Sequence, residues 1–516
     1  MKININIYRA GLLISFVAIN ILIVVAISNI LSYLNTGAER SSMLHTSIDK
    51  QLAYQPEVEW QPLVNEGRSM ESQTLQQIEK DYLNAWYIRN VAYLSNKKYG
   101  IKDFYTDSAR VNLYKQIDYQ VKNNLHIEGT TIAHHPELLF YSADGQMVVI
   151  KDKGVQRYER VLDRKKVLLE NSEKDDFKAI LLLEDGFWRI RHLVKEKNSY
   201  SENTLQEKDR IVVKNGAFLI NEQPFHLKGI NYYPAKTPWD LFGKRFDSTI
   251  LKKDFKLIKS IGLNSIRIFI PYENFGKENV HPRKLEKLKI VLDLAQENDI
   301  KVVLTLFDFY GDYSVLNWTL THRHAQQIVE TLKNHPALLA WDIKNEPDLD
   351  FESRGKRMVL AWLKNMIKLI KSYDNSHPVT IGWASPEAAI ELKDHVDFVS
   401  WHFYQDMGKL ENAYSKLKVA TSGKLLVLQE FGLSSYKGFW NPFGYTEEEQ
   451  ANYHQKMQQF IKKKKIPFMS WTLYDFETVP KNVVGRLPWR KQQQKHFGFI
   501  TSDGIPKASF KYISHD

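Results

Sequence analysis

The sequence predicts an α/β protein in three parts: a (β/α)₈ TIM barrel, a small α+β domain before it, and one N-terminal transmembrane helix. Eight short apolar runs alternate with amphipathic helical segments in residues 206–516. Apolar strands separated by helices are typical of a parallel sheet covered on both faces, and eight such units close into a barrel. Residues 70–205 show strand-like alternation, and a long uncharged stretch follows Arg9 near the N-terminus.

Residues 1–40 are predicted to form a signal-anchor transmembrane helix. After Lys2 and Arg9 the chain carries no charged residue until Glu39. A helix that crosses a bilayer needs about 20 apolar residues, whereas the apolar part of a cleaved signal peptide has about 7–15. Positively charged flanks stay on the cytoplasmic side. We therefore expect a single-pass protein of the cell membrane with the residues after 40 extracytoplasmic, either periplasmic or extracellular. Whether the segment is cleaved stays open.

Residues 41–69 lack a clear period and are predicted to be a linker, and residues 70–205 a small α+β domain. Helical spacing of apolar residues covers 72–87 and 107–123. Strand-like segments follow at 126–134, 137–143, 146–150, 155–170, 177–184 and 187–195. Helices followed by an antiparallel sheet, closing on a strand that contains Phe187 to Ile190, resemble the nuclear-transport-factor-2-like fold. Domains of that fold can bind small ligands, catalyse reactions or pair with another chain, and the sequence does not select among these roles. We expect a spacer or a module that binds a protein partner.

The adjacent histidines His134 and His135 fall within one of these predicted strands. Successive side chains of a strand point to opposite faces, so the two rings are not expected to converge on one ion. We expect both to be structural rather than a metal-binding pair.

Residues 206–516 carry the eight predicted barrel strands, at 227–233, 264–270, 301–307, 338–345, 378–384, 396–404, 424–431 and 467–475. Helices are predicted between them, at 249–261, 283–299, 321–335, 352–373, 408–420 and 446–464. A hairpin at 210–220, turning at Asn215 and Gly216, is expected to close the bottom of the barrel. In such barrels the chemistry lies at the C-terminal ends of the strands.

Two of these strand ends carry a glutamate. The fourth run ends in Asn345-Glu346-Pro347, and the seventh ends in Glu430-Phe431-Gly432. This pair resembles the retaining β-glycosidases of clan A, which include glycoside hydrolase family 5 with its cellulases and mannanases. The resemblance implies that Glu346 is the acid/base and Glu430 the nucleophile. Retaining hydrolysis needs the two carboxyl groups about 5–5.5 Å apart across the scissile bond.

The same resemblance implies roles for further residues at strand ends. Arg267 would bond to the nucleophile and Asn345 to the sugar 2-hydroxyl. His402 would line the site near the acid, Tyr404 would touch the nucleophile, and Trp471 would stack on a sugar ring. Other strand ends supply further candidate sugar contacts, namely Asn231, Tyr232, Trp383 and Asp308. Asp308 stands where many family cellulases have a histidine, which leaves mannanase-like and exo-acting relatives open.

Composition limits the other classes of function. The chain has no cysteine, which excludes disulfides and cysteine-bound metals, and we expect no metal and no cofactor. The net charge of +11 favours anionic surroundings, but no nucleic-acid-binding motif is present. The expected function is retaining hydrolysis of O-glycosidic bonds in a β-linked polysaccharide, either a β-glucan or a β-mannan. A transglycosylase and a non-catalytic polysaccharide-binding accessory of glycan export are the alternatives. The sequence leaves endo or exo action and oligomeric state open.

Overall fold

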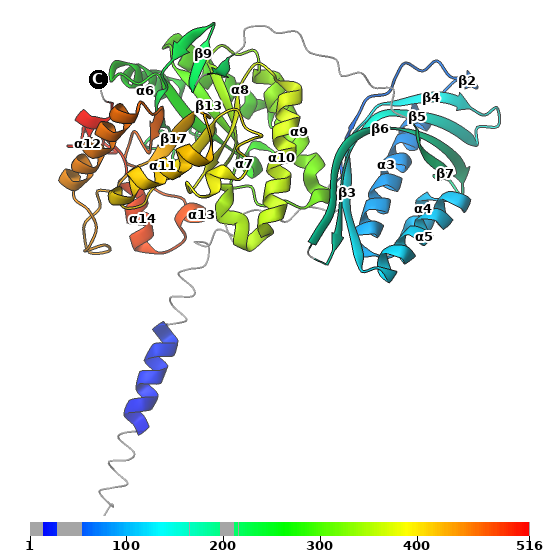
Figure 1. Ribbon diagram of the computed structural model, residues 1–516, viewed down its shortest axis with the longest axis horizontal. Helices are drawn as coiled ribbons and strands as arrows, with labels where there is room; N and C mark the ends of the chain where they lie inside the picture. The colour runs from blue at the N-terminus through cyan, green and yellow to red at the C-terminus, as the bar shows by residue number, and fades with distance from the viewer. Residues whose placement is uncertain (1–13, 28–53, 165, 197–210, 215, 515–516) are drawn as a thin grey trace, which may run out of the picture.

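The computed structural model describes residues 14–27, 54–164, 166–196, 211–214 and 216–514. It forms two bodies that lie side by side, a barrel and a smaller unit with a curved sheet (Figure 1). Eight parallel strands close the barrel in sequence order, which confirms the predicted eight-unit frame. They are β11 (Lys228–Asn231), β12 (Ser265–Pro271), β13 (Lys301–Asp308), β14 (Leu338–Asn345), β15 (Val379–Trp383), β16 (Val399–Phe403), β17 (Leu426–Phe431) and β18 (Phe468–Ser470).

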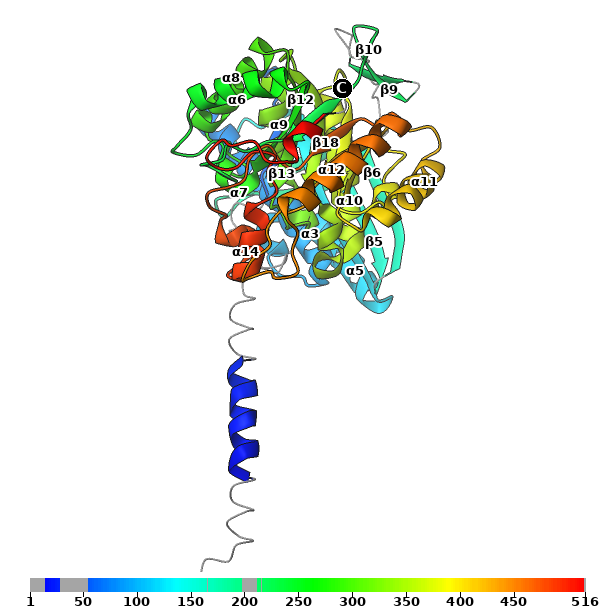
Figure 2. The same ribbon diagram turned by 90° about the vertical axis from the view of Figure 1, so that its left-hand side faces the viewer.

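Helices surround the strands, as the view in Figure 2 shows for α6, α8, α10 and α12. The longer ones are α6 (Ser248–Ser260), α8 (Pro282–Glu297), α9 (Trp318–Leu332), α10 (Lys356–Tyr373), α11 (Leu410–Ala420) and α12 (Glu447–Lys464), with short α7 (Tyr272–Phe275), α13 (Lys481–Val484) and α14 (Pro488–Lys495). Helix α12 shows why these segments are helical. Thr446 and Glu449 form a capping box, and lysines occupy its last turn, where they interact favourably with the helix dipole.

A three-stranded hairpin unit covers the N-terminal end of the barrel, as expected. It consists of β8 (Val212–Lys214), β9 (Ala217–Ile220) and β10 (Gln223–Phe225). Phe218 of β9 is buried and packs edge-on against Phe398, which directly precedes β16. The hairpin therefore closes the end of the barrel opposite the predicted chemistry, and it keeps water from the apolar strand starts.

The smaller unit places helices against a seven-stranded sheet. Its helices are α3 (Ser72–Ser95), α4 (Ile101–Phe104) and α5 (Asp107–Lys122). Its strands are β1 (Glu57–Val58), β2 (Glu66–Gly67), β3 (Leu125–His134), β4 (Pro136–Tyr141), β5 (Met147–Asp163), β6 (Lys166–Glu184) and β7 (Phe187–Glu196). The order of helices before the antiparallel strands β3 to β7 is as expected, while β1 and β2 precede the helices and pair in parallel. The resemblance to the nuclear-transport-factor-2-like fold stays a prediction.

Two boundaries in this region differ from the predicted ones. The segments expected at 146–150 and 155–170 are not separate strands, because β5 runs through them and turns into β6 near Arg164. A bulge at Gly154 interrupts the alternation, and this glycine adopts a positive φ of 58°. The predicted linker at 41–69 also ends earlier, since β1 and β2 pair with β3 and β4. Strands of two residues are too short to show a period.

The two adjacent histidines form separate bonds within this sheet. Nδ1 of His134 lies 2.6 Å from the carboxylate of Asp152, and its Nε2 lies 2.8 Å from the hydroxyl of Thr131. Nδ1 of His135 lies 3.1 Å from the carbonyl of Lys153. The rings thus bond to different partners within the sheet, and they do not converge on one point.

Specific contacts join the smaller unit to the barrel. Arg323 of α9 donates to the carbonyls of Gln55 and Pro56, both at 2.6 Å. The ring of Tyr158 on β5 lies 4.4 Å from the ring of Trp318, measured between centroids, and both side chains are buried. These contacts bury aromatic surface that each unit alone would expose to water.

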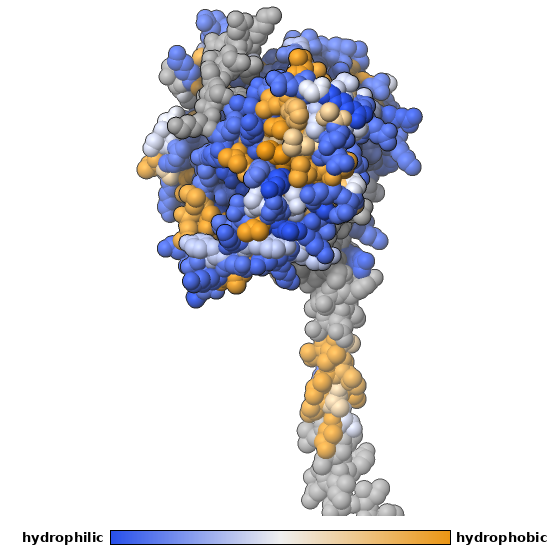
Figure 3. Space-filling view, turned by 90° about the vertical axis from the view of Figure 1, so that its right-hand side faces the viewer, coloured by the Kyte–Doolittle hydropathy of each residue, from blue (hydrophilic) through white to orange (hydrophobic). Residues whose placement is uncertain are grey.

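The N-terminal segment is described only in part. Residues 14–27 form an exposed apolar helix, visible below the folded units in Figure 3. Among the described helices, none has the length and apolar content that crossing a bilayer requires. The remainder of the predicted anchor, at 1–13 and 28–40, lies outside the described residues. Figure 3 also shows an apolar patch on the face of the smaller unit that points away from the barrel.

Candidate active site

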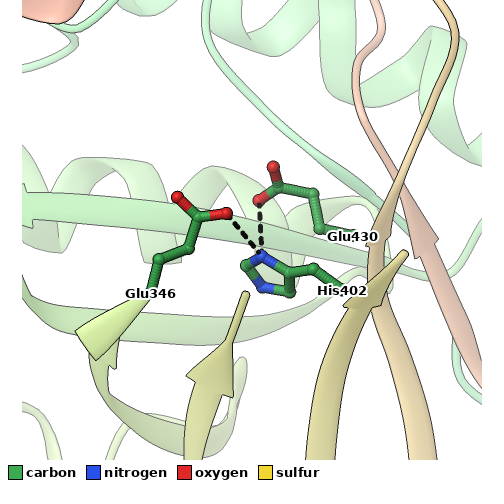
Figure 4. Close-up of side chains that lie close together, drawn as sticks. All are labelled: Glu346, His402 and Glu430. Carbon is green, nitrogen blue, oxygen red and sulfur yellow. Dashed lines mark hydrogen bonds and ion pairs between the residues drawn. The ribbon is translucent and has the colours of Figure 1, made fainter. Parts of the chain in front are cut away.

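The two strand-end glutamates converge at the mouth of the barrel. Glu346 follows β14, and Glu430 lies on β17. Carboxylate oxygens of the two side chains lie within 4.8 Å of each other, and a ring nitrogen of His402 lies within the same distance of both. Figure 4 shows the imidazole of His402 between the two carboxylates. Two residues far apart in the sequence therefore share one small space, as a retaining mechanism needs.

Arg267 of β12 holds Glu430 from within the barrel. Its Nη1 donates to Oε2 of Glu430 at 3.0 Å, and its Nη2 donates to Oδ2 of Asp342 at 2.7 Å. Further bonds go to the side-chain oxygens of Asn231 and Asn345, at 3.1 and 2.8 Å. The guanidinium is fully buried, so these partners compensate the loss of its hydration. Because these bonds hold the guanidinium of Arg267 in place, its bond to Glu430 restricts the orientation of that carboxylate.

Tyr404 and His402 complete the surroundings of Glu430. The hydroxyl of Tyr404 donates to Oε1 of Glu430 at 2.7 Å. Nδ1 of His402 lies 3.1 Å from Oε1 of Glu346 and 3.9 Å from Oε2 of Glu430. Burial opposes the charged form of His402, but the two carboxylates outweigh it and raise the pKa of His402 above its ordinary value.

The pKa of Glu430 reflects opposing influences. Burial raises the pKa of Glu430 above its ordinary value, and the neighbouring Glu346 carboxylate adds to that effect. His402, Arg267 and the hydroxyl of Tyr404 act in the opposite direction. Glu430 therefore takes up a proton at a higher pH than a free glutamate does, while Arg267 and Tyr404 limit that rise.

The backbone at Glu346 is held in a left-handed conformation, with φ of 50° and ψ of 50°. This region is unfavourable for a residue with a Cβ, so it persists only where surrounding bonds enforce it. The amide of Glu346 donates to the carbonyl of Gly382 at 2.7 Å. The carboxylate of Asp348 accepts from the amide of Ala384 and the hydroxyl of Ser385, both at 2.8 Å. These bonds fix the turn that directs Glu346 into the barrel mouth.

A cleft of about 410 Å³ surrounds the two glutamates. Most of its lining side chains are aromatic or aliphatic, and the remaining ones are polar or acidic. The lining residues named in advance are Asp308, Asn345, Glu346, Tyr404, Glu430 and Trp471. A large apolar surface with a few convergent polar groups is typical of a ligand-binding cleft. His402 and Arg267 lie beneath this surface and contact the glutamates from within the protein.

Three predicted sugar contacts do not lie in the cleft. Asn231 is fully buried and bonds to Arg267 and to the carbonyl of Gln429. Tyr232 points to the outside of the barrel, where its hydroxyl donates to Asp254 at 2.6 Å. Trp383 is buried against Phe351, also outside the barrel.

Strand alternation explains these corrections, because neighbouring side chains face opposite sides of the barrel wall. Gly382 faces the interior, where an added Cβ would lie 2.6 Å from Nη2 of Arg267, so Trp383 must face outward. By the same alternation Tyr233, not Tyr232, reaches the cleft.

Sequence reasoning missed several residues of the site. The cleft is also lined by Tyr233, Trp239, Phe269, Phe309, Leu349, Val483, Val484, Gln494 and Phe497. Asp342 was missed as the partner of Arg267, although it lies on β14 four residues before Glu346, a spacing of two alternations. That alternation was a usable signal for Asp342. The cleft residues after β13 and β18 lie in loops and short helices that carry no clear periodic signal, and only the fold brings them to the cleft.

The spacing of Glu346, His402 and Glu430 would also permit a bound metal ion. Carboxylate and imidazole are common metal ligands. The guanidinium of Arg267, 3.0 Å from Glu430, places a fixed positive charge against this cluster and opposes binding of a cation. The positive charge of Arg267 and the bond from Tyr404 therefore fit a glutamate that acts directly on substrate.

Comparisons with known proteins agree with this geometry. Residues 220–477, half of the chain, match the family model "Cellulase (glycosyl hydrolase family 5)". Human β-glucuronidase is 31% identical over 317 residues, which cover 56% of this chain and 45% of that protein. The enzyme of Chlorocebus aethiops is 29% identical over 318 residues, with the same coverage. The chain thus spans less than half the length of these curated relatives.

Solved structures show a more distant likeness. The exo-β-1,4-mannosidase Op5Man5 from Opitutaceae bacterium strain TAV5 is 17% identical, with a TM-score of 0.48 over 58% of this chain and 61% of that chain. A β-galacturonidase from Eisenbergiella tayi bound to galacturonate is also 17% identical, with a TM-score of 0.47 over 75% of this chain and 70% of that chain.

Proposed function

The chain belongs to glycosyl hydrolase family 5, and on that premise we propose that it is a retaining β-glycosidase that cleaves a β-linked polysaccharide with Glu346 as acid/base and Glu430 as nucleophile. The observation that carries the proposal is the approach of the two carboxylates to within 4.8 Å. This is close to the separation of about 5–5.5 Å that retaining enzymes use, and short of the about 6.5–9.5 Å that inverting enzymes need for a water molecule.

In the first step, Oε of Glu430 attacks the anomeric carbon while Glu346 gives its proton to the leaving glycosidic oxygen. A covalent glycosyl–enzyme ester forms, and the C–O bond to the leaving sugar breaks. In the second step, Glu346 takes a proton from water, whose oxygen attacks the same carbon and releases Glu430. Arg267 and Tyr404 support the charge of Glu430 when it leaves. We assign the contact with the sugar 2-hydroxyl to Asn345, and its bond from Arg267 supports this role.

The composition of the cleft favours a neutral sugar. Among its lining side chains, all within the described part of the chain, none is a lysine or an arginine. A uronic acid carries a carboxylate that would lose its hydration in the cleft without a cationic partner. We therefore propose a β-glucan or a β-mannan as substrate and not a glucuronide, although the curated relatives reported above are β-glucuronidases.

Two further expectations remain proposals. We propose that the N-terminal segment anchors the protein in the cell membrane with the barrel outside the cytoplasm, on the evidence of the uncharged stretch after Arg9. We also propose that the smaller unit binds a protein partner. The apolar patch on its outer face supports this proposal (Figure 3).

The test uses the protein without residues 1–40 and a panel of soluble β-glucans, β-mannans and aryl β-glucuronides. We expect sugar release from one of the neutral polymers, with retention of anomeric configuration detected by NMR. Replacement of Glu346 by Ala should abolish release of poor leaving groups, and azide should restore turnover as a β-glycosyl azide. A 2-fluoro glycoside should label Glu430 covalently. Labelling of another residue, or an inverted product, would exclude the assigned roles.

A further inference from the structure

The loop between β17 and α12, residues 432–446, is long and carries several exposed aromatic side chains. Connections from strand to helix in α/β units have about 2–6 residues, and much longer ones are commonly functional. Four aromatic residues of this loop point to solvent: Phe439 and Phe443 are 86% and 94% exposed, and Trp440 and Tyr445 are 44% and 48% exposed. Exposed apolar groups of this size mark binding surfaces.

This loop is structured. The amide of Gly438 donates to the carbonyl of Asn441 at 3.2 Å, and the amide of Asn441 donates back at 2.9 Å. The amide of Gly444 donates to the same carbonyl of Asn441 at 3.1 Å. The rings of Phe439 and Trp440 meet edge to face, with centroids 5.0 Å apart. The aromatic side chains therefore extend from a turn whose backbone is held by its own hydrogen bonds.

The base of the loop is attached to the wall of the cleft. The ring of Tyr436 stacks on His496, with centroids 5.3 Å apart and planes 12° from parallel. The amide of Ser435 donates to the carbonyl of His496 at 2.9 Å. The next residue, Phe497, lines the cleft and packs against Tyr404 at 6.1 Å. A continuous series of contacts therefore leads from the partner of Glu430 to the base of the exposed loop.

We propose that Phe439, Trp440, Phe443 and Tyr445 form an aromatic platform that binds the part of a neutral β-linked glycan chain extending beyond the cleft. This inference rests on the function proposed above. Sugar rings present C–H groups from one face, and aromatic rings offer flat, apolar surface with a negative face to these groups. A platform beside the cleft would hold a polymer while one of its bonds lies between Glu346 and Glu430.

The charge of the loop favours this occupant over a lipid surface. Residues 432–445 contain one charged side chain, Lys437. Segments that bind anionic membranes carry several lysines or arginines beside their apolar groups. A neutral glycan needs none, and the loop supplies polar groups through Asn441 and the hydroxyl of Tyr445.

The test measures retention of the protein in native gels that contain soluble β-1,4-glucan or β-1,4-mannan. All proteins carry Glu346→Gln, so that the polymer is not degraded during the measurement. Adding Trp440→Ala together with Phe443→Ala should weaken the apparent affinity for the polymer about fivefold or more, as expected for the loss of aromatic contact residues. The matched control is Tyr99→Ala, because Tyr99 is 90% exposed and lies on the smaller unit. It should not change retention, and thermal melts should show that all variants remain folded.

Unchanged retention of the double variant would overturn the platform. The platform would also be overturned if the double variant kept its polymer binding but lost binding to vesicles of phosphatidylglycerol and phosphatidylcholine. That result would identify a lipid surface as the occupant. Hydrolysis of short aryl β-glycosides by the unsubstituted chain reports on the proposed function separately, because these substrates do not reach the loop. If the unsubstituted chain hydrolyses these glycosides and the double variant keeps its polymer retention, the platform is excluded and the proposed function is not. If the unsubstituted chain does not hydrolyse them and the double variant loses polymer retention, the platform is supported and the result counts against hydrolysis.

Discussion

Arg267 and Asp342 form a fully buried ion pair, with 2.7 Å between Nη2 and Oδ2. Removing one member of such a pair leaves an uncompensated buried charge, which costs about 3–5 kcal/mol of stability. We therefore expect Arg267→Met to lower the free energy of unfolding by about that amount. Activity should fall by about a hundredfold or more, because Glu430 also loses its bond to a cation. Urea unfolding and steady-state kinetics measure the two effects.

Arg283 offers the control for this experiment, since it is exposed on α8. Arg283→Met should change neither the free energy of unfolding nor the activity measurably. An Arg267→Met protein with full stability and full activity would contradict the function assigned to the pair.

The bond from Tyr404 to Glu430 predicts a change in the pH dependence of activity. The hydroxyl stabilises the charged carboxylate, so it lowers a pKa that burial raises. In Tyr404→Phe this influence is lost and the pKa of Glu430 rises further. Because Glu430 must be ionised to attack, the acidic limb of kcat/KM should move to higher pH. A pH profile of kcat/KM on an aryl glycoside measures the shift.

Tyr474 provides a matched variant for this comparison. Its hydroxyl donates to the carboxylate of Asp254 at 2.7 Å, outside the cleft. Tyr474→Phe should leave the acidic limb in place. A shift of the acidic limb to lower pH in Tyr404→Phe would mean that the hydroxyl does not stabilise the ionised form of Glu430.

The contact of Tyr158 with Trp318 predicts that the smaller unit stabilises the barrel. Both rings are buried and their centroids are 4.4 Å apart. Tyr158→Ala would leave a cavity against Trp318, and losing a buried aromatic side chain costs about 3 kcal/mol or more. We expect a lower melting temperature and an increase in accessibility of Trp318 to a fluorescence quencher. Phe187→Ala, at an exposed position of β7, serves as the control, and an equal loss in both variants would argue against the interface.

The position of Arg267 predicts that activity does not depend on a divalent metal ion. Its guanidinium lies 3.0 Å from Glu430, so a cation bound between Glu346, His402 and Glu430 would meet strong repulsion. Dialysis against a chelator should leave kcat and KM unchanged, and adding magnesium or zinc should not increase either. A loss of activity that a specific metal restores would show that the three residues are ligands.

The sequence by itself determined the barrel and its two glutamates. Parallel strands covered on both faces need continuous apolar runs, so each of the eight appears in the sequence as a short apolar segment. Chemistry in this fold lies at the C-terminal ends of the strands. Glu346 and Glu430 stand at two of these ends, and the resemblance of their Asn-Glu-Pro and Glu-Phe-Gly motifs to those of family 5 distinguished them from the other acidic residues.

Only the tertiary structure decided which neighbouring side chains enter the cleft. Tyr232 and Tyr233 are equivalent in the sequence, but the alternation of β11 continues into the residues after it, so the first side chain meets Asp254 and the second lines the cleft. Phe497 lies in a loop, and a loop has no regular period from which the direction of its side chain could be predicted. The periodicity of apolar residues in the sequence reflects which face of a helix or strand is buried. The direction of a single side chain at a strand end depends on the twist and closure of the whole barrel.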